Sequence, residues 1–285
     1  RAASEIVREH ALRAGMPSFA QEADKSGSNV STAAAAGGER GAAATLSLAY
    51  ELYEIGTASG DALTVLTAAK LAASAEVEAK EPAALDPAGF DAEGRTLEPF
   101  GPRRSAPGVP AARGRVMNGG ETRPAAMATF RAAANEDEGA AEAPATAAEM
   151  FAKATELAGD DEALKEIISD AQAETSRGRV GGAVSWLSRL NSGKMDIWEV
   201  PFYGNSYAEV AVVGDGDANL DMVITDENGN VICYDTSPSD QVYCDFVPAW
   251  DGYFYIAVEN TGRSRNSYYL MTNCPPAVAR KGRPG

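Results

Sequence analysis

Residues 214–232 read GDGDANLDMVITDENGNVI, and this stretch decides the fold of the C-terminal third of the chain. Its apolar side chains alternate at Leu220, Met222 and Ile224, which is the two-residue period of a strand with one buried face. The pair Asn228-Gly229 follows, and both residue types tolerate the positive φ angles of a tight β-hairpin turn. The stretch therefore predicts two antiparallel strands joined by a short turn.

Further strand-like segments lie on both sides of this hairpin. They are short and separated by turn signals about every 8 to 12 residues, which is typical of a sandwich or barrel. The segments are 184–190, 195–202, 207–213, 231–235, 241–247, 253–258 and 267–272. We expect hairpins around 191–194, around Pro238-Ser239 and around 260–262. An antiparallel β-sandwich over residues 183–274 is therefore predicted.

All three cysteines of the chain, Cys233, Cys244 and Cys274, lie in this β region. If the chain folds back around Pro238, Cys233 lies opposite Cys244, within the range of a disulfide. Cys274 would then be unpaired or bridge to another chain, because an odd count leaves one cysteine over. Two alternatives stay open: a bridge that uses Cys274, and three reduced, buried thiols. The Cys233–Cys244 disulfide is the prediction.

Oxygen-bearing side chains alternate in the loop that precedes the strand at 220–225. Asp215, Asp217, Asn219 and Asp221 are spaced as a hard cation needs, because calcium takes six to eight oxygen ligands. Asp226 or Asp240 could add a further carboxylate. The loop departs from the EF-hand pattern, so a calcium site here would be non-helical. The alternative is a polar loop whose Asp and Asn side chains bond to their own backbone.

The order of two motifs in this region carries a family resemblance. Residues 214–232 are followed by residues 250–270, which read WDGYFYIAVENTGRSRNSYYL. Together they resemble the bacterial pre-peptidase C-terminal (PPC) domain. The resemblance implies a jelly-roll-like sandwich of an exported bacterial protein. Members of that family often accompany secreted peptidases, and related modules bind calcium or extracellular polymers.

Tyr253 and Tyr255 are two residues apart in an expected strand, so they share one side of it. Tyrosine on an exposed sheet face suits contact with carbohydrate or protein, because it combines apolar area with a hydroxyl group. These two residues are therefore candidates for a ligand face. The alternative is packing in the core.

The N-terminal part has a helical rather than a strand period. Residues 41–80 and 146–178 each predict an αα-hairpin, with Gly60-Asp61 and Gly159-Asp160 ending one helix and capping the next. We expect the two hairpins to form a small helical bundle within a multidomain α and β chain. A further helix is expected over 3–14 in the helical segment 1–80, and a tail over 275–285. Residues 81–145, dense in Pro, Ala and Gly, are expected to be a linker or insert.

Charge and composition exclude several functions. The formal charge of −16 and the sequence pI near 4.5 argue against a nucleic-acid partner, because phosphate binding requires a clustered basic surface. No stretch approaches the roughly 20 apolar residues of a transmembrane segment. His10 is the single histidine, which disfavours Ser-His-Asp and Cys-His catalysis and most zinc sites.

These features predict a non-enzymatic, exported protein that is periplasmic, secreted or on the cell surface. The expected function is a binding or structural adaptor, with a PPC-like β-sandwich, calcium as a candidate stabilising ion, and a protein or extracellular polymer as partner. The alternative is an accessory module of a secreted hydrolase, or a hydrolase itself. The sequence leaves the oligomeric state open.

Overall fold

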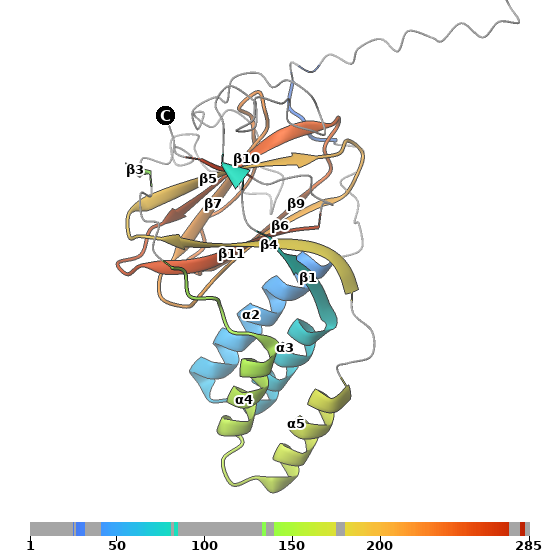
Figure 1. Ribbon diagram of the computed structural model, residues 1–285, viewed down its shortest axis with the longest axis vertical. Helices are drawn as coiled ribbons and strands as arrows, with labels where there is room; N and C mark the ends of the chain where they lie inside the picture. Colours follow the sequence, from blue (N-terminus) through green and yellow to red (C-terminus); the bar gives the residue numbers. More distant parts are fainter. Residues whose placement is uncertain are drawn as a thin grey trace, which may run out of the picture.

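A computed structural model describes residues 25, 27–31, 41–80, 83–84, 133–134, 140–174, 180–273 and 280–282. The expected helix over 3–14, His10, Cys274 and most of 81–145 lie outside the described residues. Four helices project from one side of a two-sheet β-sandwich (Figure 1). This confirms the predicted fold class of a helical bundle followed by a β-sandwich.

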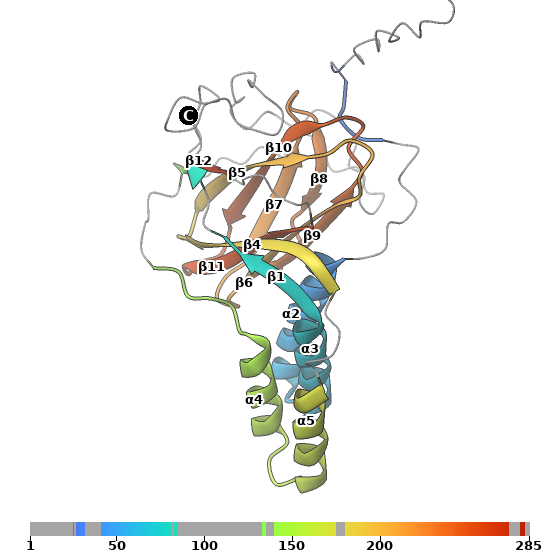
Figure 2. The same ribbon diagram turned by 45° about the vertical axis from the view of Figure 1, so that its right-hand side comes forward.

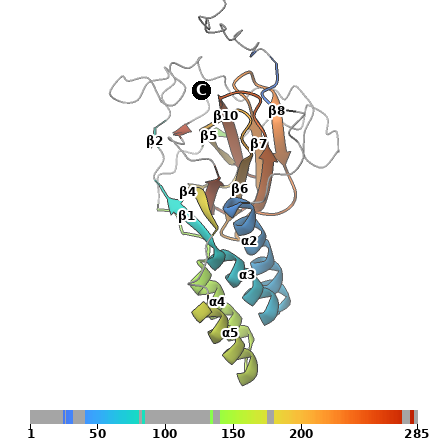
Figure 3. The same cartoon turned by 90° about the vertical axis from the view of Figure 1, so that its right-hand side faces the viewer.

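The helices form where the sequence predicts two hairpins. They are α2 (Ala42–Ser59), α3 (Ala62–Ser74), α4 (Ala147–Leu157) and α5 (Glu162–Glu174). Gly60 ends α2 at φ 69°, a left-handed conformation that glycine adopts without steric cost. Asp61 then caps α3 by accepting a hydrogen bond from the Leu63 amide at 3.0 Å. Figure 3 shows the two hairpins side by side, with α3 against α4.

The strands form two sheets, which we name the helix-side sheet and the far sheet. The helix-side sheet has the order β1 (Ala75–Ala79), β4 (Val180–Leu190), β11 (Asn266–Thr272), β6 (Ala208–Gly214), β9 (Gln241–Phe246). The far sheet has the order β2 (Ala83–Ala84), β12 (Arg280–Gly282), β5 (Lys194–Phe202), β10 (Gly252–Asn260), β7 (Leu220–Thr225), β8 (Val231–Asp235), and β3 (Ala133–Ala134) also pairs with β5.

The edges of the sandwich extend beyond the expected range of 183–274. Residues 75–79, expected within the helical hairpin 41–80, form strand β1 and pair parallel with β4 (Figure 2). Edge strands in the expected linker and tail also pair parallel, β3 with β5 and β12 with β2. The sandwich is therefore antiparallel in its centre and mixed at its edges. An edge strand exposes unpaired amide and carbonyl groups, and these additions pair with them.

Only one of the four expected hairpins pairs within a sheet as predicted. Strands β7 and β8 are antiparallel neighbours around Gly229, whose φ is 82°. The other three turns carry the chain from one sheet to the other: β4 to β5, β8 to β9, and β10 to β11. Those hairpin predictions were wrong because a turn residue specifies that the chain reverses and leaves open which strand lies beside it.

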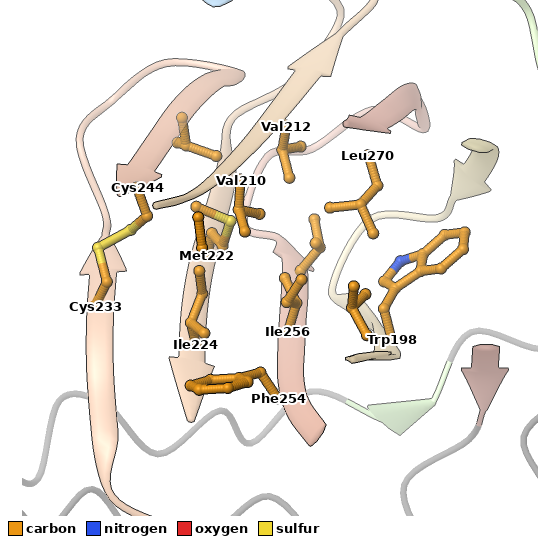
Figure 4. Close-up of a cluster of buried hydrophobic side chains, with 14 of the residues drawn as sticks. Trp198, Val210, Val212, Met222, Ile224, Cys233, Cys244, Phe254, Ile256 and Leu270 are labelled. Carbon is orange, nitrogen blue, oxygen red and sulfur yellow. A yellow bond between two sulfur atoms is a disulfide. The ribbon is translucent and has the colours of Figure 1, made fainter. Parts of the chain in front are cut away.

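Large side chains fill the space between the two sheets (Figure 4). Phe254 contacts Phe202 and Phe246 with ring centroids 5.5 and 4.9 Å apart. At one end of this core, Asp196 is buried and accepts hydrogen bonds from the Tyr268 hydroxyl at 2.7 Å and from Ser188 Oγ at 2.8 Å. A buried carboxylate with two donors avoids the cost of an unpaired charge.

A second core joins the helices to the sandwich. Its sheet members, Ala211, Val213 and Met271, lie on the face of the helix-side sheet that points away from the far sheet. Glu209 of the same face accepts a hydrogen bond from the Gly41 amide at 2.7 Å, at the N-terminus of α2. A carboxylate there offsets the positive end of the helix dipole. The helices and the sandwich are therefore packed as one unit.

Candidate functional site

A cavity of about 620 Å³ lies where α2 meets one end of the sandwich. Its walls come from α2, from the β6–β7 loop and from the β8–β9 loop. The lining residues are Tyr50, Tyr53, Glu54, Thr57, Ala58, Ala145, Gly214, Asp215, Gly216, Asp217, Ala218, Asn219, Pro238, Ser239, Asp240 and Gln241. The cavity thus combines the two halves of the chain, and it is a preformed concave site of the size that ligands occupy.

One face of α2 supplies the helical wall. Tyr50, Tyr53, Glu54 and Thr57 are spaced i, i+3, i+4 and i+7, which places them in a row along the helix. Tyr50 is buried, Tyr53 and Glu54 are partly buried, and Thr57 is exposed. The row therefore runs from the core towards solvent.

Glu54 and Asp240 form a carboxyl pair in this cavity. Gln241 Nε2 donates to Glu54 Oε1 at 3.1 Å and to Asp240 Oδ1 at 2.9 Å. Burial, followed by the hydrogen bond with Asp240 and the charge of Asp240, raises the pKa of Glu54 to about 8. A neighbouring carboxyl group favours the neutral form of Glu54, because two like charges side by side repel each other.

Asp240 is the carboxyl group of the pair that is held by more hydrogen bonds. It is 5% exposed, and its Oδ2 accepts from the Gly216 amide at 2.6 Å and from Asn266 Nδ2 at 3.2 Å. Gly214 packs directly against it, and a Cβ at Gly214 would collide with the Asp240 side chain. Asp240 therefore accepts hydrogen bonds from three donors, with Gln241 Nε2 as the third.

The four alternating calcium candidates lie in the β6–β7 loop and at the start of β7, and two of them, Asp215 and Asp221, accept hydrogen bonds from protein groups. Asp215 accepts from the amides of Asp217 at 3.2 Å and Ser267 at 2.8 Å, and burial raises its pKa. Asn219 Nδ2 donates to Asp221 Oδ1 at 3.0 Å. Among the described residues, no three Asp, Glu, His or Cys side chains gather as they would around a metal ion.

Asp226 lies at the other end of β7 and is not part of that loop. Its Oδ1 accepts from the amides of Asn228 at 2.9 Å and Asn230 at 2.8 Å, so it orders the β7–β8 turn. Its Oδ2 accepts from the amide of Asn29 at 2.8 Å. Including Asp226 in one ligand set with Asp215 was wrong, because the whole length of β7 separates them.

Asn29 fixes an N-terminal segment to this second end of the sandwich. Its side chain is fully buried, its Oδ1 accepts from the Trp250 amide at 3.0 Å, and its Nδ2 donates to Glu227 Oε2 at 3.2 Å. Val30 packs against the sandwich core. The sequence offered no signal for this contact, because the pairing of residues about 200 positions apart follows from the fold alone.

The Cys233–Cys244 disulfide is present, with the Cα atoms 6.2 Å apart (Figure 4). It differs from the expectation in what it joins. Cys233 lies on β8 of the far sheet and Cys244 on β9 of the helix-side sheet, so the bond links the two sheets rather than two strands of one hairpin.

Tyr253 and Tyr255 share one side of β10, as expected, but they do not form an exposed ligand face. They are 7% and 6% exposed. Tyr255 packs with Met195, Ile197 and Ala257. The alternative that they pack inside the protein is the one that the structure supports.

Sequence reasoning found part of the cavity wall, at Asp215, Asp217 and Asn219, and considered Asp240 only as an additional calcium ligand. It gave no function to Glu54 or Gln241. The available signal was the row of polar side chains on one face of α2. A helix face that points to solvent carries the same kind of row, so the row alone does not indicate a site. Only the position of α2 beside the β8–β9 loop makes Glu54 part of a pair.

In the described ranges, no helix has the length and apolar character needed to cross a membrane.

Comparisons with known proteins concern the sandwich. No protein-family model and no curated protein sequence matches the chain. Among solved structures, the pre-peptidase C-terminal domain of the collagenase from Bacillus anthracis is similar to part of it, with 15% identity and a TM-score of 0.28. The match covers 31% of this chain and 86% of that domain. It is a domain of the type that the residues of the C-terminal third resemble, and at this similarity it carries no information on ligand or activity.

Proposed function

We propose that this protein is an exported, non-catalytic binding or adaptor protein whose binding site is the cavity between α2 and the sandwich. The observation that carries the proposal is the construction of that cavity from both halves of the chain, with Glu54 of α2 bonded through Gln241 to Asp240. A site built across two packed elements holds its shape before the partner arrives, which reduces the entropic cost of binding. The proposed partner is a protein or an extracellular polymer.

The disulfide supports the exported location. Cys233 and Cys244 are both fully buried and joined, and such bonds persist in oxidising compartments such as the periplasm and the extracellular space. A periplasmic, secreted or cell-surface location is therefore part of the proposal.

Blocking the cavity tests the binding function. Thr57 is an exposed lining residue, so Thr57→Trp fills the mouth of the cavity without disturbing a packed core. Thr67→Trp is the matched control, because Thr67 is exposed on α3 and does not line the cavity. We expect the wild type and Thr67→Trp to retain the same partner from an envelope extract or on a cell-wall polymer, and Thr57→Trp to lose it. Equal retention by both variants would place binding elsewhere.

The carboxyl pair favours a second candidate function, a hydrolase or its accessory module. A carboxyl group with a pKa near neutrality beside a second carboxylate is an arrangement that acid–base catalysis uses. A screen of peptide and glycoside substrates would decide this. Turnover that Glu54→Gln and Asp240→Asn each abolish would establish the hydrolase and contradict the non-catalytic proposal.

Calcium stabilisation of the Asp215–Asp221 loop is a separate proposal. The buried Asn219 Oδ1 accepts no hydrogen bond from the described residues, which leaves one oxygen for a cation, whereas Asp215 would have to release backbone amides. With the sub-millimolar to millimolar affinity of extracellular calcium modules, millimolar calcium would stabilise the fold by about 1 kcal/mol, or about 2 to 4 °C. Melting in calcium and in chelator checks this, with Asp217→Asn as the variant that loses the shift. Equal midpoints would remove the calcium site.

A further inference from the structure

The cavity beside Glu54 has more hydrogen-bond acceptors than donors. Gln241 is only 9% exposed, and its Nε2 serves both carboxyl groups of the pair while its Oε1 accepts no hydrogen bond from the described residues. Asn219 also lines the cavity, and its buried Oδ1 likewise accepts no hydrogen bond from the described residues. A buried acceptor without a donor costs free energy, so the cavity is suited to a ligand that brings donors.

The charge of the cavity points in the same direction. Glu54, Asp240, Asp215 and Asp217 line it, and none of the described lining residues is Lys, Arg or His. The whole chain carries a formal charge of −16, which attracts a cationic partner over a longer range. The groups that bring donors and positive charge together are ammonium and guanidinium groups, which donate and never accept.

The size and walls of the cavity favour an organic cation over a metal ion. A volume of about 620 Å³ is far larger than the coordination shell of one ion, and no three metal-ligating side chains of the described residues gather there. Tyr50 and Tyr53 add aromatic rings to the wall, and aromatic rings attract guanidinium and ammonium groups. Exposed lining residues at the mouth, such as Thr57 and Asp217, leave room for a chain that continues outside.

We propose that this cavity binds the guanidinium or ammonium group of an Arg or Lys side chain on a partner polypeptide. This inference rests on the binding function proposed above and names the chemistry of the partner. The basic side chain enters beside Tyr53, its N–H groups reach Glu54 and Asp240, and Glu54 releases its proton to solvent as the positive charge binds.

A matched pair of peptides tests this with the full chain. The probes are capped Ser-Gly-Arg-Gly-Ser, the same peptide with uncharged citrulline in place of arginine, and calcium chloride alone. Binding is followed by chemical-shift titration in about 50 mM salt, where screening is weak. We expect the arginine peptide to bind and the citrulline peptide to bind at least about tenfold more weakly.

Two variants of the protein locate the site. Glu54→Gln should weaken binding of the arginine peptide about tenfold, and Glu166→Gln, an exposed position on α5 that removes the same charge, should not change it. The effect of Glu54→Gln should be larger at pH 9 than at pH 6. At pH 6 the wild-type Glu54 is already protonated, so the substitution removes no charge there. The other acids that face Glu54 are Asp240, Asp215 and Asp217 in the cavity and Glu51 on the same helix. Ala58→Arg, which places a guanidinium at the mouth from within the chain, should also block the peptide.

Three results would overturn the inference. They are no binding of the arginine peptide, equal binding by the wild type and Glu54→Gln, and calcium binding that depends on Glu54 while the peptide does not bind. If a partner is still lost with Thr57→Trp while Glu54→Gln retains it, the binding function stands and only the basic-ligand inference fails. Melting curves of each variant show whether it is folded at the temperature of titration.

Discussion

The two cores of this molecule are built in opposite ways. The core between the sheets consists of large side chains, including Trp186, Trp198 and Phe254, and it is crossed by the disulfide. The core between the helices and the helix-side sheet is made largely of alanine, at Ala49, Ala69 and many similar positions. Large side chains bury much apolar area each, whereas alanine allows helix backbones to approach closely but buries little. The sandwich should therefore stand alone more readily than the helices, which rely on the sheet for part of their core.

The two cores can be followed separately. All three tryptophans, Trp186, Trp198 and Trp250, belong to the sandwich, so tryptophan fluorescence reports on the sandwich. Circular dichroism at the helical band reports on the helices, which include α2 to α5.

The largest expected effect comes from truncating the sandwich core. Phe254→Ala should lower the free energy of unfolding by about 3 to 5 kcal/mol, because a fully buried aromatic ring leaves a cavity. In urea titrations both probes should shift together, since the helices lose the sheet on which they pack. Leu63→Ala, on a side chain that is 56% exposed, is the control with little expected effect. Helices that persist after the fluorescence transition would contradict the dependence of the helical core on the sandwich.

Removing the disulfide should have the next largest effect. The Cys233→Ala, Cys244→Ala double variant should lose about 3 kcal/mol, because the bond closes a short loop with a sequence separation of 11 and constrains the unfolded chain. In urea titrations, tryptophan fluorescence should be the first of the two probes to show this loss of stability, because the disulfide lies in the sandwich. Reduced wild-type protein should show a similar loss, and an unchanged midpoint in both samples would show that packing alone holds the sheets together.

Overpacking the alanine core should make the helical signal and the fluorescence change at different urea concentrations. Ala69 on α3 is fully buried, so Ala69→Leu should cost about 1 to 3 kcal/mol in the helical core. We expect the helical signal to disappear at a lower urea concentration than the fluorescence change. Thr67→Leu, at an exposed position of the same helix, is the matched control. Coincident transitions would mean that the two cores unfold as one cooperative unit.

The smallest expected effect is a dependence of stability on pH at the junction of the two cores. Because burial raises the pKa of Glu54 to about 8 from an ordinary value of 4.5, the neutral form is favoured by folding. Its contribution is fully present below about pH 4.5 and is lost as the pH rises through about 8. Glu54 is only partly buried, so water reduces the effect to about 2 to 4 °C in the melting midpoint between pH 5 and pH 9. Glu54→Gln should remove that part of the slope, and parallel slopes for the two proteins would show that Glu54 titrates normally.

Much of the fold could be predicted from local patterns. The alternation at Leu220, Met222 and Ile224 and the Asn228-Gly229 turn produced the one hairpin that the structure confirms within a sheet. The helical hairpins followed from Gly60 and Asp61, whose conformation and capping are local. The disulfide was predicted correctly from two cysteines near a turn, although its strands belong to different sheets.

The candidate site could not be predicted in the same way. The alternating acids between Asp215 and Asp221 lie at the same end of the sandwich as the cavity, but Asp215 accepts hydrogen bonds from the amides of Asp217 and Ser267, and Asp221 accepts one from Asn219. The pair in the cavity joins Glu54 to Asp240, which lie far apart in sequence and come from a helix and a loop of opposite halves. Asp226, close to the loop in sequence, lies at the far end of a strand.

The sequence by itself determined the helices α2 to α5, the central strands, the turns, the helix caps and the PPC-like strand pattern, because each depends on residues within a few positions of one another. The tertiary structure alone decided which sheet each strand joined, that residues 75–79 and 280–282 complete the sheet edges, and that α2 lies against the sandwich. These arrangements depend on which apolar faces from distant segments are buried against each other. A local sequence pattern shows that a face is apolar but does not show which other face it packs against. The cavity exists because of that last choice, since it brings the acids of α2 and of the β8–β9 loop together.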